Sequence, residues 1–174
     1  MAAWGAVIVR RAEIEDADAM ARIIAVVAEE GLLGSQPPVD VAARAQKFQE
    51  AVRSDGHDAV WVLEDDGQVV GNAGVSEGPP GVLYLGMALL PHARGQGGGR
   101  ALLQAITQYA EGCGAHKIDL EVWVENARAI TLYISAAFEI EGTRRNHYRR
   151  RDGQLRSALL MSRYLTSNFS QAKS

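Results

Sequence analysis

Three consecutive glycines stand where a strand-like pattern gives way to a helix-like pattern. They belong to the segment Arg94-Gly95-Gln96-Gly97-Gly98-Gly99-Arg100, which follows the apolar run from Val82 to Leu90 and a proline at Pro91. Glycine inside a helix costs about 1 kcal/mol relative to alanine, so a helix that begins on three glycines indicates a need for bare main chain. Free N–H groups at a helix N-terminus bind anions, and Arg94 and Arg100 add positive charge. The segment therefore predicts a phosphate-bearing ligand.

Two well-known phosphate-binding loops do not match this segment. A P-loop needs Gly-Lys-Ser/Thr, whereas Gly99 is followed here by Arg100 and Ala101. The dinucleotide-binding fingerprint needs a third glycine where Arg100 stands. It also needs an acidic residue after the next strand, for which only Glu121 and Glu125 are candidates. Both nucleotide-binding classes are therefore disfavoured.

Apolar periodicities and turn residues predict the element order β-α-α-β-β-β-α-β-α-β-β. The strand-helix-strand unit over 82–124 needs a crossover, so its two strands are expected to be parallel neighbours, and the strands on either side of it to pair antiparallel. We predict an α/β (α+β) fold with a mixed, mostly antiparallel sheet and helices on both faces. Asp16 or Asp18 is the expected cap of the first helix, and Asp40 opens the second. The predicted strands cover 6–10, 59–63, 68–75, 82–90, 116–124, 138–150 and 155–164, with Asp-Gly turns at 66–67 and 152–153.

Composition narrows the class of protein. The 174 residues suggest a single domain, which we place at 1–165 before a polar tail at 166–174. No apolar run reaches the roughly 18 to 20 residues of a membrane helix. The first residues lack the basic and apolar regions of a secretory signal, so a cytoplasmic protein is expected. Cys113 is the single cysteine and the histidines are scattered, so no disulfide framework and no metal site are expected.

The glycine segment and its surroundings resemble the GNAT superfamily of acetyltransferases. Arg94-x-x-Gly97-x-Gly99 is similar to the family's Q/R-x-x-G-x-G/A pyrophosphate loop, and Leu85 to Leu89 with Pro91 resembles its fourth strand. The resemblance continues to the end of the predicted fold and covers most of 7–164. The further matching patterns are Leu120-Glu121-Val122, Asn126, Ala129-Ile130-x-Leu132-Tyr133, Phe138, Gly142, and the closing hairpin Glu141 to Asn146 with Asp152-Gly153.

This resemblance implies an N-acetyltransferase that moves the acetyl group of acetyl-CoA to a primary amine by direct attack in a ternary complex. The backbone N–H groups of 95–100 would hold the pyrophosphate. The pantetheine arm would add to the fourth strand through main-chain hydrogen bonds, and Asn126 would cap its helix, bind the pantetheine amide, or do both. The implied cofactor-binding residues are Met87, Ala88, Leu89, Arg94, Gly95, Gln96, Gly97, Gly98, Gly99, Arg100, Asn126 and Tyr133.

The resemblance also implies three catalytic groups. Tyr133 would be the general acid that protonates the leaving thiolate, and the backbone N–H of Leu89 would stabilise the developing oxyanion. Glu121 would be the base that takes a proton from the ammonium group of the acceptor, directly or through a water molecule. The alternatives to Glu121 are Glu77, Glu29 and Glu30, because the acceptor side is where the family varies most.

The uneven distribution of charged residues along the chain indicates which acceptor classes could bind. Residues 1–86 carry 6 basic and 14 acidic side chains (−8), whereas residues 87–174 carry 12 and 7 (+5). The closing hairpin favours an amino acid or analogue, or a protein N-terminus, while the acidic half would also admit a polyamine or an aminoglycoside. The arginines of 144–151 either hold a substrate carboxylate or form a solvated hairpin. Alternation along a strand splits them between two faces, so they do not predict nucleic acid. A homodimer is a family-level expectation.

Two other functions stay open as alternatives. Gly74 to Gly78 matches the G-x-S-x-G pattern of serine hydrolases, but Pro79-Pro80-Gly81 follows where the nucleophile elbow needs a helix. A non-catalytic module that binds acetyl-CoA would share the fold, and the presence of Glu121 and Tyr133 favours catalysis over it.

Two residues depart from the family pattern. Gly98 replaces a branched apolar residue, which would loosen the first helical turn. Ala137 replaces a glycine at a position that often has positive φ, so a local adjustment is expected there.

Overall fold

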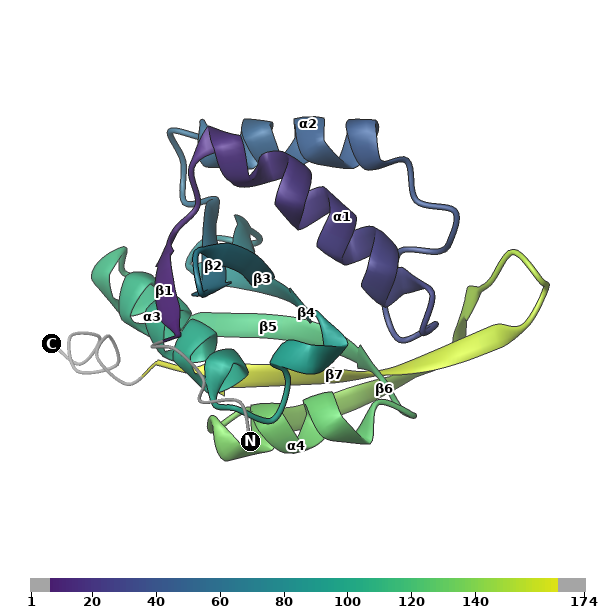
Figure 1. Cartoon of the computed structure of the whole chain (residues 1–174). Coiled ribbons are helices and arrows are strands. Elements are labelled where there is room, and N and C mark those ends of the chain that lie inside the picture. Colours follow the sequence, from purple (N-terminus) through teal and green to yellow (C-terminus); the bar gives the residue numbers. More distant parts are fainter. Residues whose placement is uncertain (1–6, 166–174) are drawn as a thin grey trace, which may run out of the picture.

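A computed structural model describes residues 7–165, so the predicted tail and the residue Ala6 of the first predicted strand lie outside the described residues. Seven strands form one sheet in the order β1-β2-β3-β4-β5-β7-β6 (Figure 1). The strands are β1 (Ile8–Arg11), β2 (Ala59–Asp65), β3 (Gln68–Glu77), β4 (Val82–Leu89), β5 (Lys117–Trp123), β6 (Glu139–Arg149) and β7 (Leu155–Tyr164). The helices are α1 (Ala17–Ala28), α2 (Val41–Val52), α3 (Gly98–Gly112) and α4 (Ala127–Ser135), with short 3-10 turns η1 (Ile14–Asp16) and η2 (Pro91–Ala93).

The sheet is mixed and mostly antiparallel, as predicted. Among the strands of the described residues only β4 and β5 pair in parallel, and the remaining neighbours pair antiparallel. Helices α1 and α2 pack on one face, over β2, β3 and β4, while α3 and α4 lie on the other face (Figure 1). Strand β7 lies between β5 and β6, an order that the element pattern did not predict. None of the helices in the described part of the chain is long and apolar enough to cross a membrane.

The alternation of β5 explains how one strand serves both a core and a cavity. Ile118, Leu120 and Val122 are buried against the α3 side of the sheet. Glu121 and Trp123 face the other side, and Trp123 is nevertheless buried because Tyr148 of β6 packs edge-on against it, with ring centroids 5.1 Å apart. The long hairpin of β6 and β7 therefore covers the end of β5 that carries Glu121 and Trp123.

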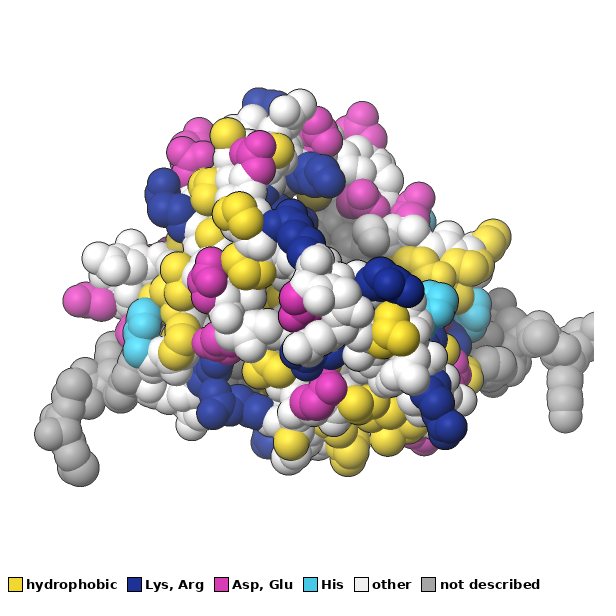
Figure 2. All heavy atoms as spheres, turned by 90° about the vertical axis from the view of Figure 1, so that its right-hand side faces the viewer, with side chains coloured by type: hydrophobic (Ala, Val, Ile, Leu, Met, Phe, Trp, Pro, Cys, Tyr) yellow, Lys and Arg dark blue, Asp and Glu magenta, His cyan; other side chains and the backbone are white. Residues whose placement is uncertain are grey.

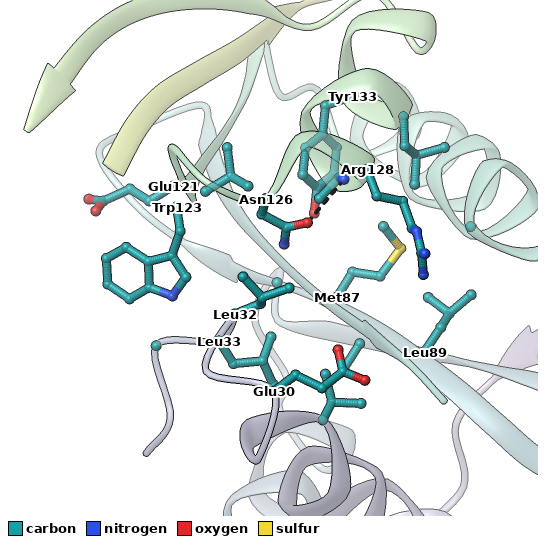
Figure 3. A pocket seen from close by; sticks show the side chains of 18 of the residues that line it. Glu30, Leu32, Leu33, Met87, Leu89, Glu121, Trp123, Asn126, Arg128 and Tyr133 are labelled. Atoms are coloured by element: carbon teal, nitrogen blue, oxygen red, sulfur yellow. Dashed lines mark hydrogen bonds between the residues drawn. The ribbon is translucent and has the colours of Figure 1, made fainter. Parts of the chain in front are cut away.

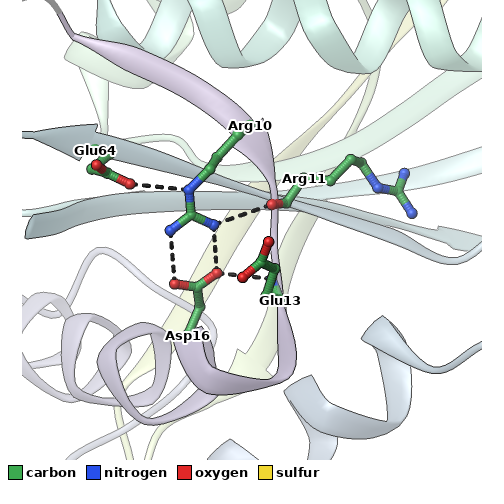
Figure 4. A network of polar contacts seen from close by, with 5 residues as sticks. All are labelled: Arg10, Arg11, Glu13, Asp16 and Glu64. Atoms are coloured by element: carbon green, nitrogen blue, oxygen red, sulfur yellow. Dashed lines mark hydrogen bonds and ion pairs between the residues drawn. The ribbon is translucent and has the colours of Figure 1, made fainter. Parts of the chain in front are cut away.

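A polar network joins β1, β2 and the start of α1 (Figure 4). Arg10 donates two hydrogen bonds to the carboxylate of Asp16, at 2.7 and 3.0 Å, and a third to Glu64 at 3.0 Å. The N–H of Glu13 donates to the same carboxylate. Asp16 precedes α1 as expected, but its side chain makes no helix-capping hydrogen bond. The prediction of a capping role is therefore wrong for Asp16, because its backbone is already helical (φ −76°, ψ −16°) and its carboxylate turns back to Arg10 and Glu13 N–H.

Replacing Asp16 by asparagine should lower the free energy of unfolding by about 1 to 3 kcal/mol at pH 7, because charge-assisted hydrogen bonds are lost. The hydrogen bonds from Arg10 hold the pKa of Asp16 below its ordinary value. The ionised side chain therefore stabilises the fold fully above about pH 4, and this contribution is lost as pH falls through the lowered pKa. Denaturant unfolding of both proteins from pH 7 to pH 2.5 measures this. A gap independent of pH would contradict it, and the exposed Asp18→Asn is the matched control.

The end of α4 keeps a left-handed residue without a glycine. Ala137 has φ +62° and is exposed, so the expected local adjustment does not occur and the alanine adopts the conformation that favours glycine. The turn is closed by hydrogen bonds from Ala137 N–H to Ile134 O and from Phe138 N–H to Tyr133 O. The buried Phe138 anchors the chain directly after it, so burial and hydrogen bonding outweigh the unfavourable dihedral.

Ala137→Gly should raise the free energy of unfolding by about 0.5 to 1 kcal/mol, because it relieves the left-handed alanine at a cost in unfolded-state entropy. For a chain of this size that is an increase of about 1 to 4 °C in the unfolding temperature. Ala136→Gly, at a neighbouring residue with φ −102°, should act in the opposite direction. Thermal unfolding of the two variants tests the pair, and stabilisation by both or neither would contradict the explanation.

Candidate active site

Strands β4 and β5 separate after three residues of pairing. Their register runs from Val82 opposite Lys117 to Tyr84 opposite Asp119, and β4 then continues to Leu89 paired with β3 alone. Leu90 N–H bonds to Val70 O of β3. Successive residues of a strand point their main-chain N–H and C=O groups in opposite directions. The main-chain groups of Met87 and Leu89 therefore face the gap, whereas those of Ala88 face β3. The gap therefore offers a strand edge to a ligand.

The glycine loop ends at the same gap, and its glycines serve different needs. Gly95 and Gly97 have φ of +77° and +88°. A Cβ on Gly98 would lie 2.5 Å from Leu63 Cδ2, and one on Gly99 would lie 2.9 Å from Leu132 Cδ2. Gly98 is buried and begins α3, so close packing against Leu63 explains the missing side chain better than a loosened turn does.

The N-terminus of α3 presents unpaired donors. The N–H groups at the start of a helix have no acceptor within the helix, and those of 95–100 donate to no other described residue. Arg100 makes only a long contact of 3.4 Å to Ser135 Oγ. Arg128 of α4 has no hydrogen bond or ion pair within the described part of the chain, and it lines the same cavity. This end of the gap has the charge and donors for an anion.

A cavity of about 1310 Å³ runs from the glycine loop past the gap to the β6–β7 hairpin. Figure 3 shows Tyr133 projecting from α4 toward Met87, with Glu30 and Leu33 on the opposite wall and Glu121 and Trp123 to one side. Gln96 and Gly98 do not line it: Gln96 donates to His92 O, and Gly98 packs on Leu63. The predicted site residues that do line it are Met87, Ala88, Leu89, Arg94, Gly95, Gly97, Gly99, Arg100, Glu121, Asn126 and Tyr133.

Tyr133 lies in an apolar setting on the wall of this cavity. Its ring packs against Phe138 at 5.6 Å between centroids, and its side chain is buried. Burial raises the pKa of the Tyr133 phenol to about 12, so the hydroxyl keeps its proton across the physiological range. Asn126 caps α4, as one of its two predicted roles required, by accepting a hydrogen bond from Ala129 N–H at 3.2 Å. The cap fixes the start of the helix that carries Tyr133.

The four candidate bases are in different places. Glu121 lines the cavity, paired with Arg144 at 3.0 Å and bonded by the Tyr148 hydroxyl. Glu30 also lines the cavity, and it pairs with Arg94 at 2.9 Å. Glu77 pairs with His57 at 2.9 Å, and neither it nor Glu29 is among the cavity-lining residues. Of the four, Glu121 and Glu30 therefore line the same cavity as Tyr133.

The hairpin tip fastens the α1–α2 connection over the cavity. Arg150 donates to the carbonyl oxygens of Leu33 and Gly34 at 3.2 and 3.1 Å, and Arg151 donates to Pro37 O. Part of the basic run thus has a structural task, because it holds the α1–α2 connection against the hairpin. Figure 2 shows acidic and basic side chains interspersed on this face, without a continuous basic field. Sequence reasoning missed the wall residues Leu32, Leu33, Trp123, Arg128 and Tyr148.

Comparison with known proteins agrees with this geometry. Residues 26–138 match the model of the acetyltransferase (GNAT) family. The chain belongs to the GNAT family. Such a protein is an acetyltransferase, which confirms the enzyme class implied by the glycine loop and the patterns that follow it.

Individual GNAT relatives share parts of the chain or the whole fold. The [ribosomal protein bS18]-alanine N-acetyltransferase of Escherichia coli K12 is 40% identical over 76 residues, which are 44% of this chain and 51% of that protein. The chain spans about half the length of the first curated relatives that it matches. A ribosomal-protein-alanine N-acetyltransferase from Brucella melitensis has a TM-score of 0.80 at 29% identity, over 91% of this chain and 99% of that one.

A second solved structure shares the fold and contains the cofactor. The yncA protein of Salmonella typhimurium, solved with acetyl-CoA, has a TM-score of 0.80 at 22% identity over 98% of this chain and 100% of that one. The present chain also contains the G-x-S-x-G match noted in its sequence. Its serine, Ser76, lies inside β3 and pairs with Tyr84 of β4. A nucleophile elbow needs a sharp turn into a helix, so the hydrolase reading is excluded by geometry.

Proposed function

We propose that this GNAT protein acetylates the primary amine of an amino acid or analogue, or of a protein N-terminus, by direct attack in a ternary complex. One observation carries the proposal: a single cavity joins unpaired N–H groups at the start of α3, the open edge of β4, Tyr133 and Glu121. The cavity can therefore hold an anionic group at the start of α3 and an extended arm along β4. An acid, Tyr133, and a base, Glu121, line the same cavity.

The residues present suit acetyl-CoA. The N–H groups of 95–100 with Arg100 and Arg128 match a pyrophosphate in charge and in hydrogen bonding. The outward-facing main-chain groups of Met87 and Leu89 match the amides of an extended pantetheine arm, while Ala88 contributes only its small side chain to the wall. When bound, acetyl-CoA supplies the acetyl thioester that the amine attacks.

Tyr133 and Leu89 are assigned to the two charges that develop in the reaction. The Leu89 N–H faces the gap and is oriented to donate to the carbonyl oxygen as that oxygen becomes negative. The Tyr133 hydroxyl holds a proton and points into the cavity (Figure 3), so it can protonate the departing sulfur. Both groups are held on regular elements, which keeps them aligned before a substrate arrives.

Glu121 is assigned as the acceptor-side base. Its carboxylate lies beside Trp123 and away from Tyr133 in Figure 3, so proton removal proceeds through a water molecule. Arg144 and Tyr148 hold the carboxylate in place through the contacts already described. The apolar walls from Leu32, Leu33 and Trp123 suit an acceptor whose amine is attached to a small apolar body.

Acetyl-CoA-dependent thiol release across an amine panel tests the function. The panel contains amino acids and analogues, N-terminal peptides, polyamines and aminoglycosides, with Tyr133→Phe as the paired enzyme. Release with amino acids or N-terminal peptides, sharply reduced in the variant, is expected. Saturable acetyl-CoA binding without release from any amine would favour a non-catalytic binding module instead, and release with polyamines alone would reject the proposed acceptor class.

A further inference from the structure

Arg94, the first residue of the glycine segment, is not directed at the phosphate end of the cavity. Its Nε donates to the carbonyl oxygen of Leu89 at 2.9 Å, and its Nη1 pairs with Glu30 at 2.9 Å. Only 19% of the Arg94 side chain is exposed, against 28% for Glu30. One guanidinium thus links the end of β4 to the residues that follow α1.

The Leu89 carbonyl needs this partner because of the break in the sheet. Its main-chain groups face the gap between β4 and β5, where no strand pairs with them. A carbonyl oxygen left without a donor in a partly buried site is costly. Arg94 supplies the donor and thereby fixes the peptide unit directly after the N–H that is assigned to the oxyanion.

Two other cations at the phosphate end do not share this task. Arg100 stands in the first turn of α3 with only its long contact to Ser135, and Arg128 has no ion pair among the described residues. Both guanidinium groups are therefore available to a phosphate, whereas that of Arg94 is already used twice. Of the three arginines, Arg94 is bound to Leu89 O and Glu30 within the protein, whereas Arg100 and Arg128 are available to a ligand.

We infer that Arg94 is a positioning residue for Leu89, and that Glu30 acts through Arg94 to couple the α1–α2 wall of the acceptor site to the oxyanion donor. The inference rests on the proposed function, because it uses the assignment of the Leu89 N–H. It excludes Glu30 as the general base and removes Arg94 from the residues that bind the phosphates through their charge.

The test compares Arg94→Gln, Glu30→Gln, their combination and Arg100→Gln in two assays, thiol release and direct calorimetric binding of CoA. Displacement of an oxyanion donor by a fraction of an ångström should lower kcat by about 10- to 100-fold in Arg94→Gln and Glu30→Gln. Because Glu30 acts only through Arg94, the kcat of the double variant should be no lower than that of Arg94→Gln. The Kd for CoA should change little in these variants and rise by about tenfold or more in Arg100→Gln.

The pH dependence of kcat/KM separates positioning from proton transfer. Both limbs of the profile should persist in Glu30→Gln, whereas loss of the limb that reports the base would identify Glu30 as that base and overturn the inference. Arg94→Lys keeps the charge toward Glu30 but not the geometry of the two bonds, so it should restore kcat only in part. Full recovery by lysine would show that charge alone matters and would also overturn it.

Failure of the proposed function would be visible separately. If the wild-type protein releases no thiol with any amine, the acetyl-transfer assignment fails, and the binding assay still decides the role of Arg94. Weaker CoA binding in Arg94→Gln, equal to that in Arg100→Gln, would place Arg94 on the phosphates and reject the inference. Unchanged binding in Arg94→Gln would support it.

Discussion

Replacing Tyr133 by phenylalanine should lower kcat by about 10² to 10⁴-fold, the usual contribution of a positioned general acid. The ring and its packing against Phe138 stay in place, so the Kd for acetyl-CoA and the unfolding temperature should hardly change. Steady-state kinetics with saturating acetyl-CoA measure the effect. Tyr109→Phe is the matched control, because the Tyr109 hydroxyl donates to His57 O and Tyr109 does not line the cavity.

The deficit of Tyr133→Phe should also depend on the leaving group. A thioester of a more acidic thiol needs less protonation as it departs, so the variant should lose less activity with such an acyl donor than with acetyl-CoA. An equal loss with both donors would contradict the assignment of Tyr133 as general acid, and it would indicate that the hydroxyl orients the substrates. The pKa of about 12 predicts no Tyr133 titration in the profile below pH 10.

Gly98→Val should lower the free energy of unfolding by about 1 to 3 kcal/mol, as overpacking does in a tightly filled core. A Cβ at this residue would meet Leu63 Cδ2 at 2.5 Å, and Leu63 is only 1% exposed. For a chain of this length the change is an unfolding temperature about 2 to 12 °C lower. The glycine is thus the complement of the large side chain of Leu63 on β2.

The Leu63→Ala background tests that complementarity. Leu63→Ala alone should cost about 2 to 5 kcal/mol through the cavity that it leaves, and the added valine at 98 should fill part of that space. The double variant should therefore be more stable than the sum of the two single effects implies, with a coupling of about 0.5 to 3 kcal/mol. Additive effects in thermal unfolding would show that the two residues do not compete for the same volume. Gly112→Val, where an added Cβ would meet nothing within 4 Å, reports the cost of valine in the same helix without the clash.

Local patterns were sufficient for most elements of the fold, because periodicity and turn chemistry act over a few residues. The Asp66-Gly67 turn has the positive φ values, +47° and +73°, that its sequence predicts. Asp40 accepts the hydrogen bond from Ala43 N–H that opens α2. The insertion of β7 between β5 and β6 left no such signal, since a hairpin pairs its two strands equally well whichever of them contacts β5.

The site residues also fall into those that a sequence motif predicts and those that no sequence pattern predicts. Residues carried by a motif, such as Tyr133 and Leu89, lie at the cavity as expected. The contacts between Arg150 and the carbonyl oxygens of Leu33 and Gly34 join residues more than a hundred positions apart through main-chain acceptors, and main-chain acceptors have no identity in a sequence. The use of Arg94 was hidden for the same reason, because its partner on β4 is a carbonyl group.

Strand β6 lies at the end of the sheet, and its arginines affect how that exposed edge interacts with other chains. A strand of 11 residues with a free outer edge is a template for association with other chains unless something discourages it. Arg144, Arg145 and Arg149 stand along that edge, and the ladder to β7 is irregular between Arg144 and Tyr148. Charge and broken regularity together blunt the edge, so a neutral substitution at Arg145, which does not line the cavity, would lower the colloidal stability of the protein while leaving the site intact.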